Sequence, residues 1–366
     1  MNVPETKKLH YGESIKWRII ICISVLILIM GCSDSSEKSG KDNAKHLTVQ
    51  KVSTIAKKKV LFVNSYHRGY DWSDGITRGI LDTFDATMKS NGEIDNSESK
   101  VTLKIFYMDT KRNKSEEFKK NAGLKAKGVI GSWKPDIVIA SDDNAAKYLI
   151  VPYYKNSKLP FIFCAINWDA SVYGFPSDNV TGMVEITVIK PMLEHLKEYA
   201  EGNRIGLLGA DTLTRRKSAA IYSSYYKLDI DNRYAATFKD WKREFEKLQD
   251  EVDMMLITSP AGISGWDQQA AVQFVLKNAK IPSGCMIPTA MPFSLIGFTK
   301  VPEEQGEWAA KTALEILAGK SPKDIPVVTN KKAQVYLNMR LAKKLGIKFP
   351  MELIERARFV EEEWPQ

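Results

Sequence analysis

Residues 135–143 read Pro-Asp-Ile-Val-Ile-Ala-Ser-Asp-Asp, a short apolar run that ends in polar residues. The run at 136–140 predicts a buried strand, because it is β-branched and bounded by polar side chains. A short amphipathic stretch at 144–150 follows and predicts a helix. A strand, a polar turn and a helix in succession form the repeating unit of α/β proteins.

The same alternation continues on both sides of this segment. Further strands are expected at 60–63, 101–107 and 161–164, and helices at 73–89 and 115–132. The helix at 73–89 carries an apolar stripe that includes Phe84 and Met88, and it is expected to end at Asn91-Gly92. Strands that alternate with helices predict right-handed βαβ units and a parallel sheet.

A second round of alternation follows in the C-terminal half. Its helices are expected at 188–199, 214–226, 240–250, 266–277 and 303–318, and its strands at 204–208, 233–237, 254–258, 285–288 and 294–298. Two rounds of about 120 residues each predict two doubly wound, Rossmann-like domains. A single (β/α)8 barrel would alternate in the same way and is the alternative fold.

The first 31 residues have the layout of an export signal. Basic residues precede an apolar run at 19–30, which is shorter than the roughly 20 residues that a membrane-spanning helix needs. The order Ile29-Met30-Gly31-Cys32 resembles a bacterial lipobox. The resemblance implies lipidation of Cys32 and an exported protein that is anchored to a bacterial membrane and faces the periplasm or the exterior. An uncleaved signal anchor is the alternative.

The segment 32–57 is polar and rich in Ser and Lys, so it predicts a disordered tether between lipid and domain. An extension that packs on the domain is the alternative. The net charge of +9 comes from basic residues spread among acidic ones, which suits an anionic membrane surface and argues against nucleic acid.

Metal, cofactor and catalytic motifs are absent from the sequence. The four histidines are scattered without ligand spacing, so we expect no metal site and no cofactor. The sequence has no G-x-S-x-G, P-loop or H-E-x-x-H pattern, which argues against an enzyme. Cys164 and Cys285 end apolar, strand-like runs, where free buried cysteine is common, and we expect no disulfide between them.

Several segments together resemble bacterial ABC-transporter substrate-binding proteins of the type I periplasmic-binding-protein fold, in the group that includes aromatic-amino-acid binders. They are Val60-Leu-Phe-Val-Asn-Ser-Tyr66, the segment 135–143, Asn179-Val-Thr-Gly182, and the stretch 314–326 with 341–350. The likeness runs from about Lys58 to Pro350. It implies two lobes that are joined by a hinge and close around a small-molecule ligand.

The same resemblance implies where the chain crosses between the lobes. The first crossing would be the Asn179 segment, and later crossings would come near Phe298 and Val327. The first lobe would then hold residues 58–178 and 300–325, and the second lobe residues 179–299 and 326–366. The helix at 303–318 would pack on the first lobe.

Elementary geometry places the ligand site without the resemblance. In an open parallel sheet, ligands bind outside the carboxyl ends of the strands. The candidate residues at those ends are Asn64, Ser65, Tyr66, Tyr70, Trp72, Ser141, Asp142, Asp143, Asn167 and Trp168 in the first lobe, and Asp211, Thr212, Ser259, Pro260 and Thr289 in the second.

The candidate aromatic and acidic residues favour different chemical features in a ligand. Aromatic rings could sandwich a planar or cationic ligand, although packing on the lobe surface is the alternative. Asp142 and Asp143 stand where amino-acid binders of the group tend to have hydroxyl and small residues, which favours a ligand with an amine or several hydroxyls. We expect one of these acids to cap the helix at 144–150 and the other to face the cleft.

Three functions are compatible with these sequence features. The first is a solute receptor that docks on an ABC permease, and the second is a sensory binding protein that acts with a membrane histidine kinase. The third, an enzyme on the same scaffold, is the least favoured. We expect a monomer in each case.

Overall fold

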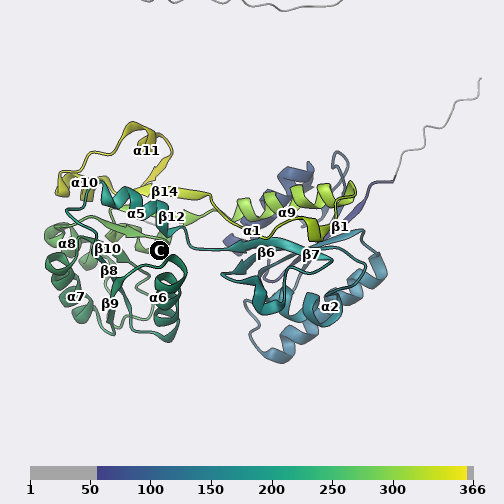
Figure 1. Cartoon of the computed structure of the whole chain (residues 1–366), viewed down its shortest axis with the longest axis horizontal. Coiled ribbons are helices and arrows are strands. Elements are labelled where there is room, and N and C mark those ends of the chain that lie inside the picture. Colours follow the sequence, from purple (N-terminus) through teal and green to yellow (C-terminus); the bar gives the residue numbers. More distant parts are fainter. Residues whose placement is uncertain (1–55, 361–366) are drawn as a thin grey trace, which may run out of the picture. The chain divides into compact units, whose positions relative to one another are not determined.

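Two doubly wound α/β lobes make up residues 56–360, the part of the chain that this computed structural model describes (Figure 1). The predicted signal peptide, Cys32 and nearly all of the predicted tether lie outside the described residues. Because the strands form two separate large sheets, the single-barrel alternative is excluded.

The sheet of the first lobe has the order β13-β7-β6-β5-β1-β4, and every neighbouring pair is parallel. Its strands are β1 (Lys59–Asn64), β4 (Thr102–Tyr107), β5 (Ile137–Ser141), β6 (Phe161–Asn167), β7 (Val180–Glu185) and β13 (Val328–Thr329). The central strand β1 pairs Asn64 with Ser141 on β5 and with Tyr107 on β4. The carboxyl ends of these strands are therefore level with one another.

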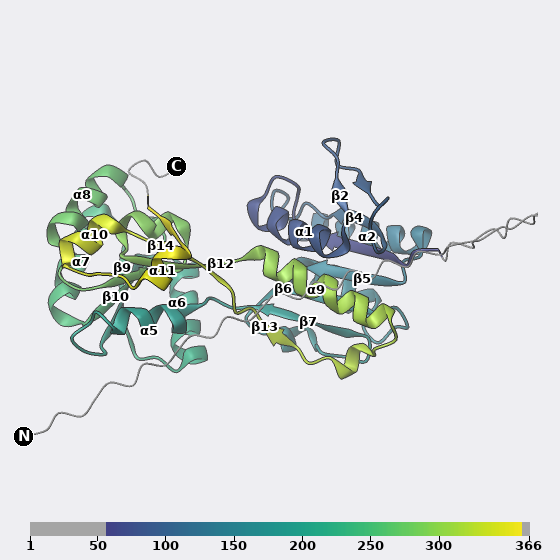
Figure 2. The same ribbon diagram turned by 90° about the horizontal axis from the view of Figure 1, so that it is seen from above.

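Helices cover both faces of the first sheet. The helices α1 (Asp71–Phe84) and α9 (Pro302–Leu317) lie side by side on one face, and α2 (Glu116–Trp133) lies on the other (Figure 2). Phe62 packs in the cluster under α1 and α9, whereas Val63 packs in the cluster under α2. Strands buried on both faces read as continuous apolar runs, which is why they were visible in the sequence.

The α1–α9 contact depends on small residues. A Cβ at Gly79 would collide with the backbone of Glu303, and one at Gly306 would collide with the backbone of Ile76. Glycine at these positions lets the two helix backbones approach closely. The helix expected at 303–318 therefore packs in the first lobe, as the resemblance implied.

The sheet of the second lobe has the order β15-β14-β12-β11-β10-β8-β9. Its strands are β8 (Ile205–Ala210), β9 (Ile230–Ala235), β10 (Met254–Ile257), β11 (Ser283–Cys285), β12 (Ile296–Lys300), β14 (Ala333–Leu337) and β15 (Ala357–Phe359). The helices are α5 (Ile189–Lys197), α6 (Leu213–Tyr226), α7 (Phe238–Glu251), α8 (Gln268–Asn278), the 3-10 helix η3 (Pro288–Phe293), α10 (Met339–Leu345) and α11 (Met351–Glu355). Only β14 runs antiparallel to its neighbour β12 among these paired strands.

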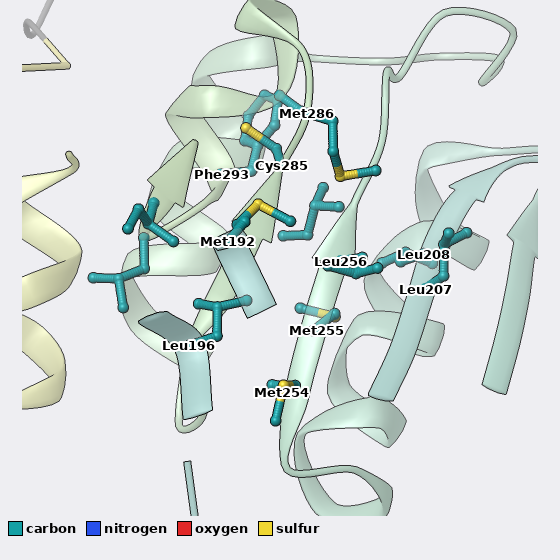
Figure 3. Packing of buried hydrophobic residues seen from close by; sticks show 14 of the residues in the cluster. Met192, Leu196, Leu207, Leu208, Met254, Met255, Leu256, Cys285, Met286 and Phe293 are labelled. Carbon is teal, nitrogen blue, oxygen red and sulfur yellow. The ribbon is translucent and has the colours of Figure 1, made fainter. Parts of the chain in front are cut away.

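Sulfur-containing and aliphatic side chains fill the core of the second lobe. Met192 and Leu196 of α5 face a layer that includes Met255 of β10 and Cys285 of β11 (Figure 3). Cys285 is buried here, Cys164 is buried in the first sheet on β6, and both thiols are free.

The crossings differ from the expected ones. Residues 180–185 form β7, which pairs with β6, so the first crossing comes after Glu185 and not at Asn179. Residues 328–329 form β13 and also pair in the first sheet. The expected boundaries at 179 and 326 therefore come several residues early. A short apolar run beside turn residues does not reveal which sheet it joins.

The helix expected at 73–89 is also wrong at its C-terminal end. The helix α1 ends at Phe84 because Asp85 adopts a left-handed conformation. The next residues form the hairpin of β2 (Thr87–Met88) and β3 (Ile94–Asp95). The Asn-Gly pair at 91–92 is the hairpin turn, with Gly92 at φ +89°, and not a helix end.

Smaller shifts occur in the second lobe. The edge strand β9 covers 230–235 instead of 233–237, because its middle residues are polar and half-buried and show little apolar pattern. The strand expected at 285–288 is β11 and ends at Cys285, since Pro288 begins η3. The strand expected at 294–298 is β12 and lies two residues later.

Candidate functional site

The carboxyl ends of β1 and β5 are joined by buried polar side chains. The Ser65 hydroxyl donates to the Ser141 carbonyl oxygen at 2.5 Å and accepts from the Ala145 amide at 2.8 Å. The Asn64 Oδ1 accepts from the Tyr66 amide at 3.0 Å and from the Ser73 hydroxyl at 2.9 Å. Asn64, Ser65 and Ser141 are fully buried, so they hold the turns of the site in place.

Asp142 supplies a buried carboxylate at the start of α3 (Asp142–Ala145). It is 2% exposed, and its Oδ1 accepts from the Trp72 indole nitrogen at 3.2 Å. Its Oδ2 has no hydrogen-bond partner. Burial, with the neighbouring charge of Asp143, raises the pKa of Asp142 to about 7. Hydrogen bonding by the Ser141 and Trp72 side chains lowers this pKa, but burial outweighs it.

Both carboxylate oxygens of Asp143, by contrast, accept hydrogen bonds. Its Oδ1 accepts from the Tyr173 hydroxyl at 2.8 Å, and its Oδ2 accepts from the Asn167 side-chain amide at 2.6 Å. Neither acid caps α3, so that expectation is wrong. The Ser65 hydroxyl, which directly follows β1, accepts a hydrogen bond from the Ala145 amide instead.

Aromatic rings and two lysines surround the acids. Tyr66 and Tyr70 meet edge to face at 5.4 Å, and the Lys111 ammonium lies 4.9 and 4.8 Å from their ring centroids. The Lys300 ammonium lies 5.1 Å from the Trp72 ring centroid. Burial and the two acids raise the pKa of Tyr66, which therefore remains a neutral hydroxyl.

Trp168 is the exception among the first-lobe candidates. It lies beyond β6 and packs against three tyrosines of α6, with ring centroids 5.7, 5.5 and 6.3 Å from Tyr222, Tyr225 and Tyr226. It thus contacts the second lobe, while its backbone amide donates to the Glu185 carbonyl oxygen at 3.0 Å.

The second-lobe candidates make local contacts. Asp211 pairs with Arg216 at 2.8 Å, and the Thr212 hydroxyl caps α6 by accepting from the Arg215 amide at 3.2 Å. The Ser259 hydroxyl accepts from the Ala261 amide at 3.2 Å, beside the half-buried Pro260. Thr289 is exposed in η3. The structure does not join these residues into a polar cluster like that of the first lobe.

Sequence reasoning missed the charged residues Lys111, Glu185 and Lys300. Lys111 follows β4, whose carboxyl end was left out of the candidate set although it meets the end of β1. Glu185 and Lys300 end β7 and β12 and form an ion pair. A lysine or glutamate at the end of an apolar strand is a weak signal, and only the tertiary structure pairs these two.

A cavity of about 570 Å³ lies apart from these residues. It is lined by β4, α2 and the segment between them, including Phe106, Phe118 and Leu124. It shares no lining residue with the candidate set. Within residues 56–360 there is no cluster of acids, histidines and cysteines arranged to hold a metal, and no helix is long and apolar enough to cross a membrane.

Solved structures with the same architecture come from several bacteria. An open, ligand-free substrate-binding protein with adhesive properties from Clostridium difficile aligns with TM-score 0.62 and 17% identity, over 84% of this chain and all of that one. A domain from Streptococcus pneumonia in complex with L-Trp aligns with TM-score 0.50 and 18% identity, over 84% of this chain and all of that one. At these identities the likeness shows the fold alone.

A periplasmic ribose transporter protein from Conexibacter woesei also aligns, with TM-score 0.50 and 11% identity, over 80% of this chain and 94% of that one. No curated protein matches the sequence. Residues 97–361 match the family described as ABC transporter substrate binding protein, which is most of the chain. This protein therefore belongs to the ABC transporter substrate-binding protein family.

Proposed function

We propose that this protein is the lipid-anchored solute receptor of an ABC importer and that it captures a small molecule bearing an amine or several hydroxyls. The carboxyl group of Asp142 carries the proposal. A buried carboxylate with an unpartnered oxygen is costly, and a cationic or hydroxyl donor on a ligand would relieve that cost.

The rings near Asp142 favour a ligand that also has a planar part. Tyr66, Tyr70 and Trp72 bring aromatic faces to the same strand ends, and rings bury much area with few rotatable bonds. The structural neighbour from Streptococcus pneumonia was solved with L-Trp, which is compatible with this ligand class. Asn167 would act by holding Asp143, which it already contacts.

We further propose that the second lobe completes the site when the lobes close. Its contributions would come from Asp211, Thr212, Ser259, Pro260 and Thr289. A ligand that contacts both lobes stabilises the closed state by its difference in affinity between closed and open forms. Trp168, which already contacts α6, would lie at the edge of this interface.

The anchoring proposal rests on the sequence before residue 33. If Cys32 carries the lipid, Cys32→Ser should release the exported protein from membranes without changing ligand affinity. Membrane fractionation measures the first effect and calorimetry the second. Retention of the Cys32→Ser protein on the membrane would point to an uncleaved signal anchor.

Native mass spectrometry of the purified full chain tests ligand capture. We expect a small molecule that stays bound through gentle purification and is released chemically unchanged. Asp142→Asn should purify without it, whereas Asp250→Asn, an exposed acid of α7 that is outside the candidate set, should retain it. A ligand that is released in altered form would support an enzyme, and a kinase gene in place of neighbouring permease genes would contradict the import role.

A further inference from the structure

Two of the three chain crossings are tied together by one ion pair. Glu185 is the last residue of β7, where the chain leaves the first sheet, and Lys300 is the last residue of β12, where it leaves the second. Their side chains form a salt bridge. Glu185 is 6% exposed, so its carboxylate depends on this partner.

The same lysine also touches the candidate site. Its ammonium lies 5.1 Å from the Trp72 ring centroid, and the Trp72 indole nitrogen donates to Asp142 Oδ1 at 3.2 Å. Trp72 thus stands between two charges of opposite sign. A single ammonium group is attracted toward both the hinge carboxylate of Glu185 and the site carboxylate of Asp142.

The charges of Lys300 and Asp142 act on each other. Burial lowers the pKa of Lys300 to about 8, and the charge of Asp142 acts in the opposite direction. Other ionisable groups surround the pair. They are Glu185 beside Lys300, Asp143, Lys111, Tyr66 and Cys164 near Asp142, Tyr173 on Asp143, and His67 beside Tyr70.

We propose that Lys300 is a positioning residue that transmits the charge of the ligand site to the hinge. When Asp142 is ionised and empty, it attracts the ammonium toward Trp72. When a cationic ligand or a proton neutralises Asp142, Glu185 holds the ammonium alone, and the ion pair between the two crossings strengthens. This inference rests on the proposed function, because it takes Asp142 as part of the ligand site.

The third crossing provides a contrast. There, the Asn330 side-chain oxygen accepts from the Ile186 amide at 2.7 Å, and Glu304 accepts from the backbone amides of Lys331 and Lys332 at 2.9 and 2.8 Å. The Lys332 ammonium pairs with Glu307 at 2.7 Å, away from Trp72 and Asp142. Lys332 is therefore a matched control for a lysine near a crossing.

Fluorine NMR of the full chain labelled with 5-fluorotryptophan can test the coupling without any ligand. The chain has 8 tryptophans, so each signal can be assigned by single Trp→Phe variants. The Trp72 signal reports on Asp142, and the Trp168 signal reports on the contact between the first lobe and the tyrosines of α6. The proton serves as the neutralising probe, in a titration from about pH 5 to about pH 9.

We expect the Trp72 and Trp168 signals to titrate together, with a midpoint near the pKa of Asp142, about 7. In Lys300→Met, the Trp72 signal should still titrate, while the Trp168 signal should lose its pH dependence. Asp142→Asn should abolish both titrations, which assigns them to this carboxyl group. Lys332→Met should behave as the unmodified protein.

Lys300→Met leaves Glu185 buried without its cation, so the double variant Lys300→Met/Glu185→Gln is tested beside it. The Trp168 signal of the double variant should also lose its pH dependence. A Trp168 signal that still follows Trp72 in both variants would overturn the proposal. So would a Trp168 signal that is unaffected by pH in the unmodified protein. Neither result would contradict the proposed function, because ligand retention is measured separately by native mass spectrometry.

Discussion

The strand ends of the two lobes carry similar polar residues but use them differently. In the first lobe, Ser65 and Asp142 are buried and bonded across neighbouring elements. In the second lobe, Asp211 and Thr212 bond to residues within one turn of α6. The first lobe therefore has a buried polar cluster that joins several elements, whereas the second lobe has polar side chains that bond only to the start of the following helix.

This difference predicts that the two lobes contribute differently to ligand binding. A pre-organised group loses little entropy when it binds, so the first lobe should supply most of the affinity and the charge preference. The second lobe should add contacts only on closure. Substitutions at one position in each lobe can therefore test this difference.

The largest expected effect is a gain in stability from Asp142→Asn. The pKa of Asp142 is raised from 3.8 to about 7, so the folded state holds this proton more tightly than the unfolded chain. The carboxylate therefore destabilises the fold above pH 7, and this penalty disappears as the pH falls toward 4. Asn at this position removes the charge and should stabilise the protein by about 4 kcal/mol at about pH 8.

Chemical denaturation of Asp142→Asn at several pH values measures this gain, with Asp211→Asn as the second-lobe control. Asp211 is an exposed acid in a surface pair, so its substitution should change the free energy of unfolding by less than about 0.5 kcal/mol. A less stable Asp142→Asn at high pH would show that the carboxylate is not desolvated in solution.

Asp142→Asn should stabilise the fold but weaken ligand binding. With the ligand recovered by mass spectrometry, Asp142→Asn should weaken binding by about 30-fold, the value of one charge-assisted hydrogen bond of about 2 kcal/mol. Calorimetry should show less than about a threefold change for Asp211→Asn. Equal losses at the two positions would mean that both lobes contribute charge recognition.

The two hydroxyl caps should differ in what they contribute to folding. Ser65→Ala removes a buried group that bonds Ser141 and Ala145, and it should cost about 1.5 kcal/mol of unfolding free energy. Thr212→Ala removes a half-buried cap of α6 and should cost about 1 kcal/mol. A larger cost for Thr212→Ala, measured by the same denaturation, would reverse the comparison.

The smallest effect is expected where cations lie over rings. The Lys111 ammonium contacts Tyr66 and Tyr70 in the first lobe, and the Arg216 guanidinium lies 4.2 Å from the Tyr234 ring centroid in the second. Each exposed contact should contribute about 0.5 kcal/mol to stability. Lys111→Met, but not Arg216→Met, should also alter ligand affinity, because only Lys111 lies near Asp142.

Much of the first-lobe site could be predicted because it depends on local pattern. The apolar runs at 60–63 and 137–140 are visible as strands, and the polar residues after them are brought together by the parallel pairing of β1 and β5. The hydrogen-bond partners of these residues could not be predicted in the same way. The cap of α3 comes from Ser65, a residue 80 positions away from the Ala145 amide that it accepts, and no local rule specifies that partner.

The sequence by itself determined the two-lobed α/β architecture, because buried parallel strands and the helices that cover them each carry a short-range apolar period. Only the tertiary structure decided that residues 180–185 join the first sheet, that Trp168 packs on α6, and that Glu185 meets Lys300 across 115 positions of sequence. Those contacts depend on which surfaces the folded elements bury together, and periodicity within one segment carries no information about a distant partner.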